Sequence, residues 1–306
     1  MTTAERTWRP TWPCRVAQQL AVLRHGPGDP TFLAAAHGAA WRGVRTPVGT
    51  ATLRLSLRPA DGEVLATAWG DGADWVLDAV PAMLGAGDDP SGFRAERHPV
   101  VDRLRRAHPH WRVPRTGLVM ESLVPAVIEQ KVTGSEAFAG YRRLVRRFGE
   151  PAPGPGAGLG LRVQPAPAAL VAIPSWEWLR LGIDHSRSST IVAAARRADA
   201  LERTLQRDHA GADRGLRSIP GIGVWTSAEV RVRAHGDPDA VSFGDYNVAK
   251  DVGYALTGRR TDDAGMAELL EPFRGHRYRV QRLVELSGIR HQRFGPRMPL
   301  RAHLPV

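Results

Sequence analysis

Apolar and polar residues alternate along residues 51–58, so that every second side chain faces the same side of a strand. Residues 59–62 carry the Pro, Asp and Gly of a tight turn, and residues 63–69 indicate the returning strand. Residues 41–45 predict an earlier strand of the same sheet. Apolar positions at helical spacing follow in residues 74–84. The first part of the chain is therefore predicted to be a small mixed α/β unit.

From residue 99 onward the apolar positions recur with the period of a helix. Residues 85–90 contain Gly, Asp and Pro and predict a boundary before this helical part. Residues 151–167 are rich in Pro and Gly and predict an irregular connection. The pattern predicts helices over residues 100–107, 120–133, 135–148, 176–181, 188–205, 228–234, 248–256 and 278–286.

Taken together, these patterns predict an α+β protein. A small N-terminal mixed α/β domain (residues 1–87) precedes an all-α domain (residues 88–290). The last segment, residues 291–306, is rich in Pro and Arg, and we expect an extended tail.

The helical pattern is interrupted at residues 216–226. Pro220 disfavours continuation of the first helix, whereas Gly221 and Gly223 allow positive φ and a close approach of backbones. Thr226 then opens the next helix. Amide groups that point outward from such a hairpin form an anion site. Because a Walker lysine and a preceding strand are missing, a nucleic-acid phosphate is favoured over a nucleotide loop, and an ordinary helix–helix turn is the alternative.

The segment after the hairpin makes the pattern more specific. Residues 236–240 end the second helix, and Asp245 then stands at an N-cap position before residues 248–256. The unit of residues 219–256 resembles the helix-hairpin-helix plus Gly/Pro-Asp (HhH-GPD) region of base-excision DNA glycosylases, in particular the AlkA type, 3-methyladenine DNA glycosylase II. The resemblance implies a small α/β domain followed by a helical glycosylase domain.

Composition adds three constraints. The formal net charge of +11 suits a polyanionic partner, and the resemblance implies double-stranded DNA with damaged bases. Cys14 is the single cysteine, which excludes a cysteine-built zinc or iron–sulfur site. The start of the chain lacks the apolar core of a signal peptide, and no apolar run reaches membrane-spanning length. We expect a monomeric cytoplasmic, nucleoid-associated protein that requires no cofactor.

Asp245 is the candidate catalytic residue. Hydrolysis of a base–sugar bond develops positive charge on the sugar, and a fixed carboxylate stabilises that charge and can help to orient water. A helix N-terminus favours the ionised carboxylate. A plain N-cap is the alternative role for Asp245. Asp237 and Asp239 are weaker candidates, because Asp-Pro-Asp is typical of a turn.

Trp225 decides the type of reaction. In members of the superfamily with lyase activity, the matching position is a lysine nucleophile, whereas an indole forms no Schiff base. Lys250 does not match that position. The resemblance therefore implies a monofunctional enzyme with water as the nucleophile. The flat face of Trp225 suits an extruded, cationic alkylated base, and simple core packing is the alternative.

Two further groups follow from the resemblance. Lys131 stands where the family fills the gap left by a flipped base, with Gln130 as the alternative and a solvated loop lysine as the plain interpretation. Phosphate contacts are expected from the amides of Gly221, Gly223 and Thr226 and from Arg187. A structural monovalent cation is expected on the main-chain carbonyls of Arg217, Ile219 and Ile222.

Glu229 departs from the AlkA pattern, which has an aromatic residue at this position. Trp225 and Glu229 are four residues apart, so their side chains lie on one helix face. A carboxylate there needs a positive partner. One candidate is a cationic base such as 3-methyladenine or 7-methylguanine, and the alternative is a surface ion pair with Arg233.

These residues predict a monofunctional DNA glycosylase of base excision repair that hydrolyses the N-glycosidic bond of alkylated bases in duplex DNA. The alternative from another class is a non-enzymatic helix-hairpin-helix protein that binds damaged or structured DNA. A catalytically inactive homologue, or a glycosylase for deaminated bases, is a third interpretation. Asp245 separates the first two, because phosphate binding alone has no use for a carboxylate that faces DNA.

Overall fold

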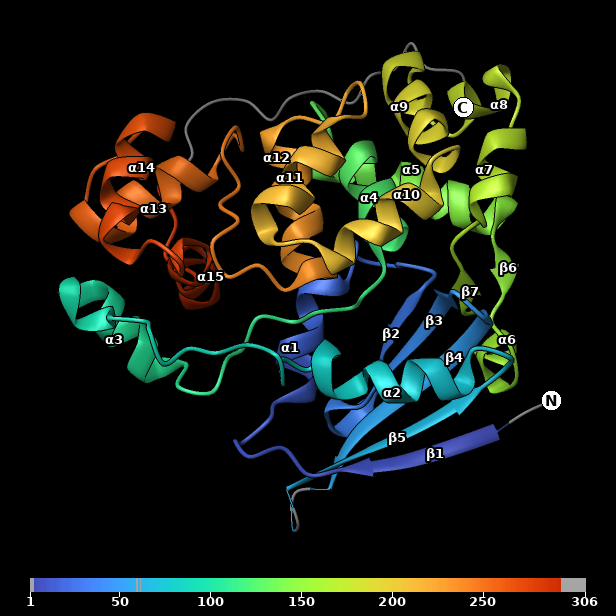
Figure 1. Cartoon of the computed structure of the whole chain (residues 1–306), viewed down its shortest axis with the longest axis horizontal. Coiled ribbons are helices and arrows are strands. Elements are labelled where there is room, and N and C mark those ends of the chain that lie inside the picture. Colours follow the sequence, from blue (N-terminus) through green and yellow to red (C-terminus); the bar gives the residue numbers. More distant parts are fainter. Residues whose placement is uncertain (1–2, 59, 61, 293–306) are drawn as a thin grey trace.

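The N-terminal part of the chain forms a five-stranded antiparallel sheet (Figure 1). The structure, a computed structural model, describes residues 3–58, 60 and 62–292. The strands follow the order β1-β5-β4-β3-β2. The predicted hairpin is confirmed, because Leu57 lies opposite Val64 in antiparallel register. The strands are β1 (Thr3–Trp8), β2 (Phe32–Ala34), β3 (Ala40–Thr46), β4 (Gly49–Arg58) and β5 (Glu63–Trp69).

Alternation gives this sheet an inner and an outer face. Leu53 and Leu55 are buried in the core on the inner face, whereas Arg54 between them is exposed. Helix α2 (Ala73–Met83) packs on the sheet, in agreement with the helix predicted for residues 74–84. The shorter helix α1 (Val16–Leu20) adds Leu20, which is fully buried, to the same hydrophobic cluster. Period-two burial thus produces the sheet core.

The prediction of an irregular connection at residues 151–167 is wrong in part. Two short strands, β6 (Glu150–Pro151) and β7 (Arg162–Val163), flank helix α6 (Pro155–Gly158), and the segment lies against the sheet. The Arg162 amide donates to the Pro30 carbonyl at 2.8 Å. A Cβ at Gly43 of β3 would lie 2.2 Å from the Arg162 carbonyl oxygen, so only glycine allows this contact.

Helix α4 (Val119–Ile128) lies at the centre of the first helical group, and nine of its ten residues are buried. The prediction placed the end of this helix at residue 133. It ends at Ile128 because the chain turns there, and Lys131 has φ +54°. The surrounding helices are α5 (Gly134–Phe148), α7 (Pro167–Ala172), α8 (Ser175–Arg180), α9 (His185–Ala195), α10 (Ala198–Glu202), α11 (His209–Arg217) and α12 (Val224–Val230).

A second helical group has its own hydrophobic cluster, which includes Val101, Val252, Met266 and Val280. Its helices α13 and α14 lie on the far side of the 236–247 loop from α11 and α12 (Figure 1). Helix α14 was not predicted from the sequence pattern. The helices of this group are α3 (Pro99–Ala107), α13 (Val248–Thr257), α14 (Asp263–Leu270) and α15 (Arg277–Ser287).

The predicted fold class is confirmed, with a small antiparallel sheet that precedes a helical part. The boundaries at residues 87 and 290 stay predictions. The tail predicted for residues 291–306 lies outside the described residues apart from its first two. In the portion of the chain that the structure describes, no helix combines the length and the apolar character needed to cross a bilayer.

Asp88 fixes the segment between the two parts. Its carboxylate accepts from the Arg279 guanidinium of α15 at 2.5 Å and from the Val113 amide at 3.0 Å. Both side chains of the Asp88–Arg279 pair are 2% exposed. A buried pair of this kind depends strongly on both partners, because the partner that remains after a substitution is a buried, uncompensated charge.

We predict that Asp88→Asn lowers the free energy of unfolding by about 3–5 kcal/mol, because it leaves Arg279 buried without a counter-charge. Denaturant titration measures this change. Asp89→Asn is the matched control, because the exposed Asp89 accepts its hydrogen bonds from the neighbouring Ser91. Equal free energies of unfolding for the two variants would contradict the prediction.

Candidate active site

The hairpin lies between α11 and α12 and is packed against α9. Gly221 has φ +89°, and a Cβ on it would lie 2.1 Å from the Thr190 hydroxyl oxygen, so this position requires glycine. Gly223 is exposed and precedes α12, which starts without a side-chain cap. The first amides of this helix therefore have no side-chain cap and can receive an anion.

Gln130 joins the turn after α4 to this hairpin. Its side-chain amide donates to the Gly221 carbonyl at 2.9 Å and to the Thr226 hydroxyl at 2.7 Å. Thr226 is buried. The next residue, Lys131, is exposed at the tip of the turn. The two candidates for filling a gap in DNA therefore differ, because Gln130 holds the hairpin and Lys131 faces outward.

Asp245 lies at the start of α13. Its Oδ1 atom accepts from the amides of Asn247 at 2.8 Å and Val248 at 3.0 Å, so its carboxylate covers the helix N-terminus. Within residues 3–292 as far as they are described, its Oδ2 atom accepts no hydrogen bond. Asp245 thus bonds to the helix start in the manner of a cap, and its second carboxylate oxygen is not used for hydrogen bonds among the described residues.

Trp225 lies beside the loop that carries Asp245. A Cβ built on Gly244 would lie 3.8 Å from the Cβ of Trp225, so the two segments are in contact. Gly244 has φ +87°, and its amide donates to the Asp263 carboxylate at 2.8 Å. Trp225 is partly buried. The structure therefore places Trp225 beside Gly244, the residue that precedes Asp245.

Glu229 pairs with Arg233, as the alternative interpretation expected, but the pair is largely buried and not on the surface. Arg233 donates to Glu229 Oε2 at 2.6 Å, and the Ser242 hydroxyl donates to Oε1 at 2.6 Å. The side chains of Arg233 and Glu229 are 17% and 15% exposed. Burial alone would lower the pKa of Arg233, but nearby negative groups, Glu229 first, hold it above its ordinary value.

Other polar residues of the site gave no signal in the sequence. The Ser242 amide donates to Gln281 Oε1 at 3.0 Å, although the two residues are 39 positions apart. Glu129 approaches His25 of the N-terminal part at 3.4 Å. Burial opposes the charge of Glu129, but His25 and Arg233 outweigh it, and the pKa of Glu129 lies below its usual value. These contacts depend on distant segments, so no motif marks them.

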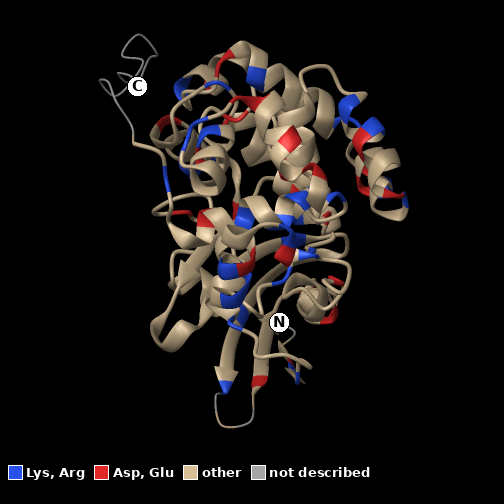
Figure 2. Ribbon diagram, turned by 90° about the vertical axis from the view of Figure 1, so that its left-hand side faces the viewer, with Lys and Arg blue, Asp and Glu red and all other residues tan. Residues whose placement is uncertain are grey.

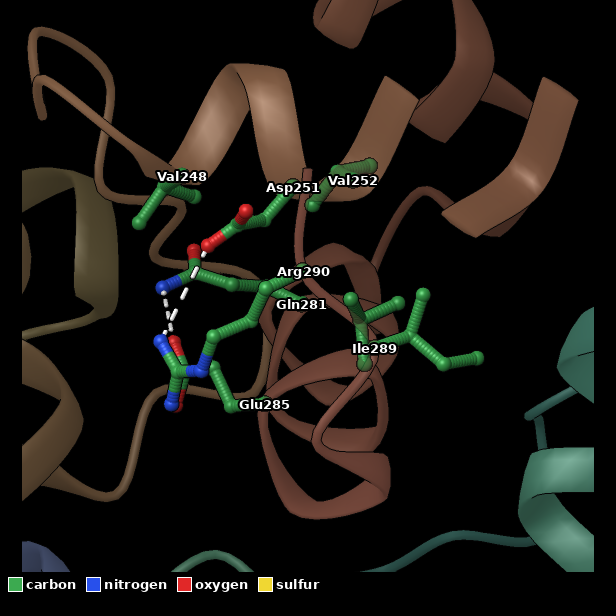
Figure 3. Close-up of a pocket in the computed structure, with 8 residues that line it drawn as sticks. Val248, Asp251, Val252, Gln281, Glu285, Ile289 and Arg290 are labelled. Atoms are coloured by element: carbon green, nitrogen blue, oxygen red, sulfur yellow. Dashed lines mark hydrogen bonds and ion pairs between the residues drawn. The ribbon is translucent and has the colours of Figure 1, made fainter. Parts of the chain in front are cut away.

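A small pocket lies between α13 and α15 (Figure 3). Asp251 lines it and pairs with Arg290 at 3.9 Å and with His291 at 2.6 Å. Gln281 is its link to the Ser242 loop. Since Asp245 and Trp225 do not line it, the pocket is not the candidate active site.

The prediction that Arg187 contacts a DNA phosphate is wrong. Arg187 is 3% exposed, and its guanidinium donates to Asp184 at 3.1 Å and to the Ile128 carbonyl at 2.8 Å. A third bond reaches the Gly182 carbonyl at 3.2 Å. Arg187 therefore joins α9 to the end of α4 and has no surface for DNA.

The distribution of charged residues does not identify one surface for DNA. Lys and Arg lie on both the sheet and the helices and are interspersed with Asp and Glu (Figure 2). The carbonyl oxygen of Ile219, one of the three expected cation ligands, accepts from the Ile222 amide at 3.1 Å. A carbonyl has two lone pairs, so this bond is compatible with a cation there. The cation stays a prediction.

The chain is similar in sequence to two Mycobacterium tuberculosis proteins, of strains CDC 1551 / Oshkosh and ATCC 25618 / H37Rv. Each is described as a probable bifunctional transcriptional activator/DNA repair enzyme AlkA. Each is 32% identical over 157 residues, which cover 50% of this chain and 29% of the relative. The chain thus matches less than a third of the length of these relatives. No protein-family model matches the chain.

Solved structures of low sequence identity share the fold. A 3-methyladenine DNA glycosylase from Archaeoglobus fulgidus is 16% identical with a TM-score of 0.77, over 92% of this chain and 98% of that chain. The Clostridium acetobutylicum 8-oxoguanine glycosylase/lyase bound to DNA is 11% identical with a TM-score of 0.69, over 93% and 96%. Schizosaccharomyces pombe Mag1 in complex with abasic DNA is 16% identical with a TM-score of 0.51, over 62% and 91%.

The buried guanidinium of Arg187 stabilises the contact between α9 and the end of α4. We predict that Arg187→Ala lowers the free energy of unfolding by about 2–4 kcal/mol, because buried carbonyl acceptors lose their charged donor. The salt dependence of DNA binding should stay unchanged. Arg217→Ala is the control, because the Arg217 side chain is 47% exposed and its loss should barely change stability. A reduced salt slope in Arg187→Ala would restore the phosphate role.

Proposed function

From the premise that this chain is related to AlkA and has the fold of helix-hairpin-helix DNA glycosylases, we propose that it is a DNA glycosylase. It hydrolyses the N-glycosidic bond of damaged bases that are flipped out of duplex DNA. The observation that carries this proposal is the Asp245 carboxylate, which is held through Oδ1 alone at the start of α13 and follows Gly244, the neighbour of Trp225.

Asp245 supplies the charge that the reaction needs. Departure of the base leaves an oxocarbenium-like sugar, and a carboxylate held in place stabilises it without reorganisation. The two amide hydrogen bonds to Oδ1 fix the position of the side chain. Oδ2 faces the sugar or the attacking water. Water is the final nucleophile, and the base leaves with the electron pair of the broken bond.

Trp225 provides the surface for the extruded base. A cationic alkylated purine such as a 3-methyladenine or 7-methylguanine gains cation–π attraction on the indole face. Glu229 stands one helical turn further and is neutralised by Arg233, so the pair closes the base pocket as a polar wall. Lesion choice rests mainly on Trp225, with Glu229 held away from direct ion pairing.

The turn after α4 fills the gap in the duplex. We assign this role to Lys131, because the Gln130 amide is engaged by the hairpin and the Lys131 side chain is exposed. The amides of Gly221, Gly223 and Thr226 hold a phosphate of the damaged strand. A monovalent cation on the carbonyls of Arg217, Ile219 and Ile222 would add positive charge at that phosphate.

We predict that Asp245→Asn retains DNA binding but loses base release by several orders of magnitude, because asparagine caps the helix without the charge. A single-turnover assay of base release from alkylated DNA measures this. Asp208→Asn, a substitution at the N-cap of α11, is the control that should keep the parent rate. Retention of more than about a tenth of the parent rate, which is only about 1.4 kcal/mol of barrier, would exclude the catalytic role.

A second prediction concerns the reaction type. Because Trp225 occupies the position of the lyase lysine, borohydride should trap no covalent enzyme–DNA species, and abasic sites should accumulate uncleaved. Denaturing gel electrophoresis of end-labelled DNA detects both outcomes. A robust trapped complex would show that an amine such as Lys131 or Lys250 forms a Schiff base and that the enzyme has lyase activity.

A further inference from the structure

Two exposed aromatic side chains and a partly exposed lysine follow Asp245 in and just before α13. Tyr246 follows Asp245 directly and is 79% exposed, and Tyr254 further along the helix is 41% exposed. Lys250 lies between them, with its Nζ atom 3.5 Å from the centroid of the Tyr246 ring. Lys250 and Tyr254 are four residues apart in the helix and share one face.

The turn between α13 and α14 adds a second cation to this surface. Lys250 and Arg260 line an open hollow together with Thr261 and Asp262. Asp262 already caps α14 by accepting from the Gly265 amide at 2.9 Å. Within the described ranges, neither Lys250 nor Arg260 forms an ion pair. Two cations that form no ion pair in the part of the chain that the structure describes, beside exposed rings, favour a polyanionic ligand over an apolar partner.

We infer that the α13 face, defined as Tyr246, Lys250, Tyr254 and Arg260, binds the phosphodiester backbone of DNA on the side of the damaged nucleotide opposite the hairpin. The inference rests on the proposed function. The hairpin precedes α12, whereas α13 extends away from Asp245 on the other side of the 236–247 loop (Figure 1). Lys250 and Arg260 reach phosphates, and the tyrosine hydroxyls can donate to further oxygens.

A second phosphate anchor has a physical purpose. A duplex held at the hairpin alone can pivot about that contact, which moves the sugar relative to Asp245. Contacts on both sides of the flipped nucleotide fix the sugar against the carboxylate. Productive positioning of the reacting atoms is worth a large part of a reaction barrier, so the second anchor supports catalysis without touching the reacting atoms.

The test is the salt dependence of DNA binding by Lys250→Ala/Arg260→Ala. Each lost phosphate contact lowers the slope of log K against log salt by about 0.9, so the double variant should lose about 2. Arg54→Ala is the matched control, because exposed Arg54 also lies over an aromatic ring, 5.6 Å from the centroid of Trp41, but on the sheet. An unchanged slope in the double variant, or an equal loss in Arg54→Ala, would overturn the inference.

Truncated duplexes locate the contact. A duplex that ends about two nucleotides from the lesion on the side opposite the hairpin should abolish the difference in salt slope between the parent and the double variant. Truncation on the hairpin side should preserve this difference. Equal differences with both truncations would overturn the placement. The binding measurements compare the parent with its variants and do not depend on excision. Failure of base release with an intact slope difference would therefore refute the proposed function and leave the α13 face as a DNA contact.

Discussion

The buried ion pair between Arg233 and Glu229 is the contact on which the geometry of the site depends. Arg233 donates to Glu229 on its own helical segment and, through Nε, to the Val22 carbonyl of the N-terminal part at 2.9 Å. Glu229 in turn accepts from Ser242, in the loop that leads to Asp245. One pair thus joins the sheet domain, the helix after the hairpin and the loop that leads to Asp245.

The charges of Arg233 and Glu229 require several hydrogen-bond partners, because both side chains are largely removed from water. A buried guanidinium or carboxylate is costly unless every polar atom finds a partner, and here both carboxylate oxygens of Glu229 have one. The resemblance places an aromatic residue at this position, which would pack but could not hold Ser242. Glu229 therefore lacks the stacking surface of an aromatic residue but holds Ser242 in the loop that leads to Asp245. This contact helps to keep Asp245 in one position.

The loop that leads to Asp245 is restrained by several helices. Ser242 is held by Gln281 of α15, and Gly244 by Asp263 at the start of α14. Asp245 itself closes the N-terminus of α13. Hydrogen bonds with three helices therefore position the Asp245 carboxylate. The fold of the chain is shared with glycosylases whose sequences are 16% identical or less. A fold of packed helices tolerates such divergence because burial pattern and turn geometry, more than residue identity, maintain it.

Local elements could be predicted from the sequence, because period and turn chemistry act over short distances. Alternation at residues 51–69 predicted two strands, and the pattern after Asp245 predicted α13, although its N-cap is Asn247 and Asp245 bonds to the helix start from two residues earlier. Which charges meet depends on the tertiary structure. Arg187 resembled a surface cation and is buried, and Glu229 is neutralised in the interior. Burial and partners depend on segments that are far apart in the chain, and local pattern carries no record of them.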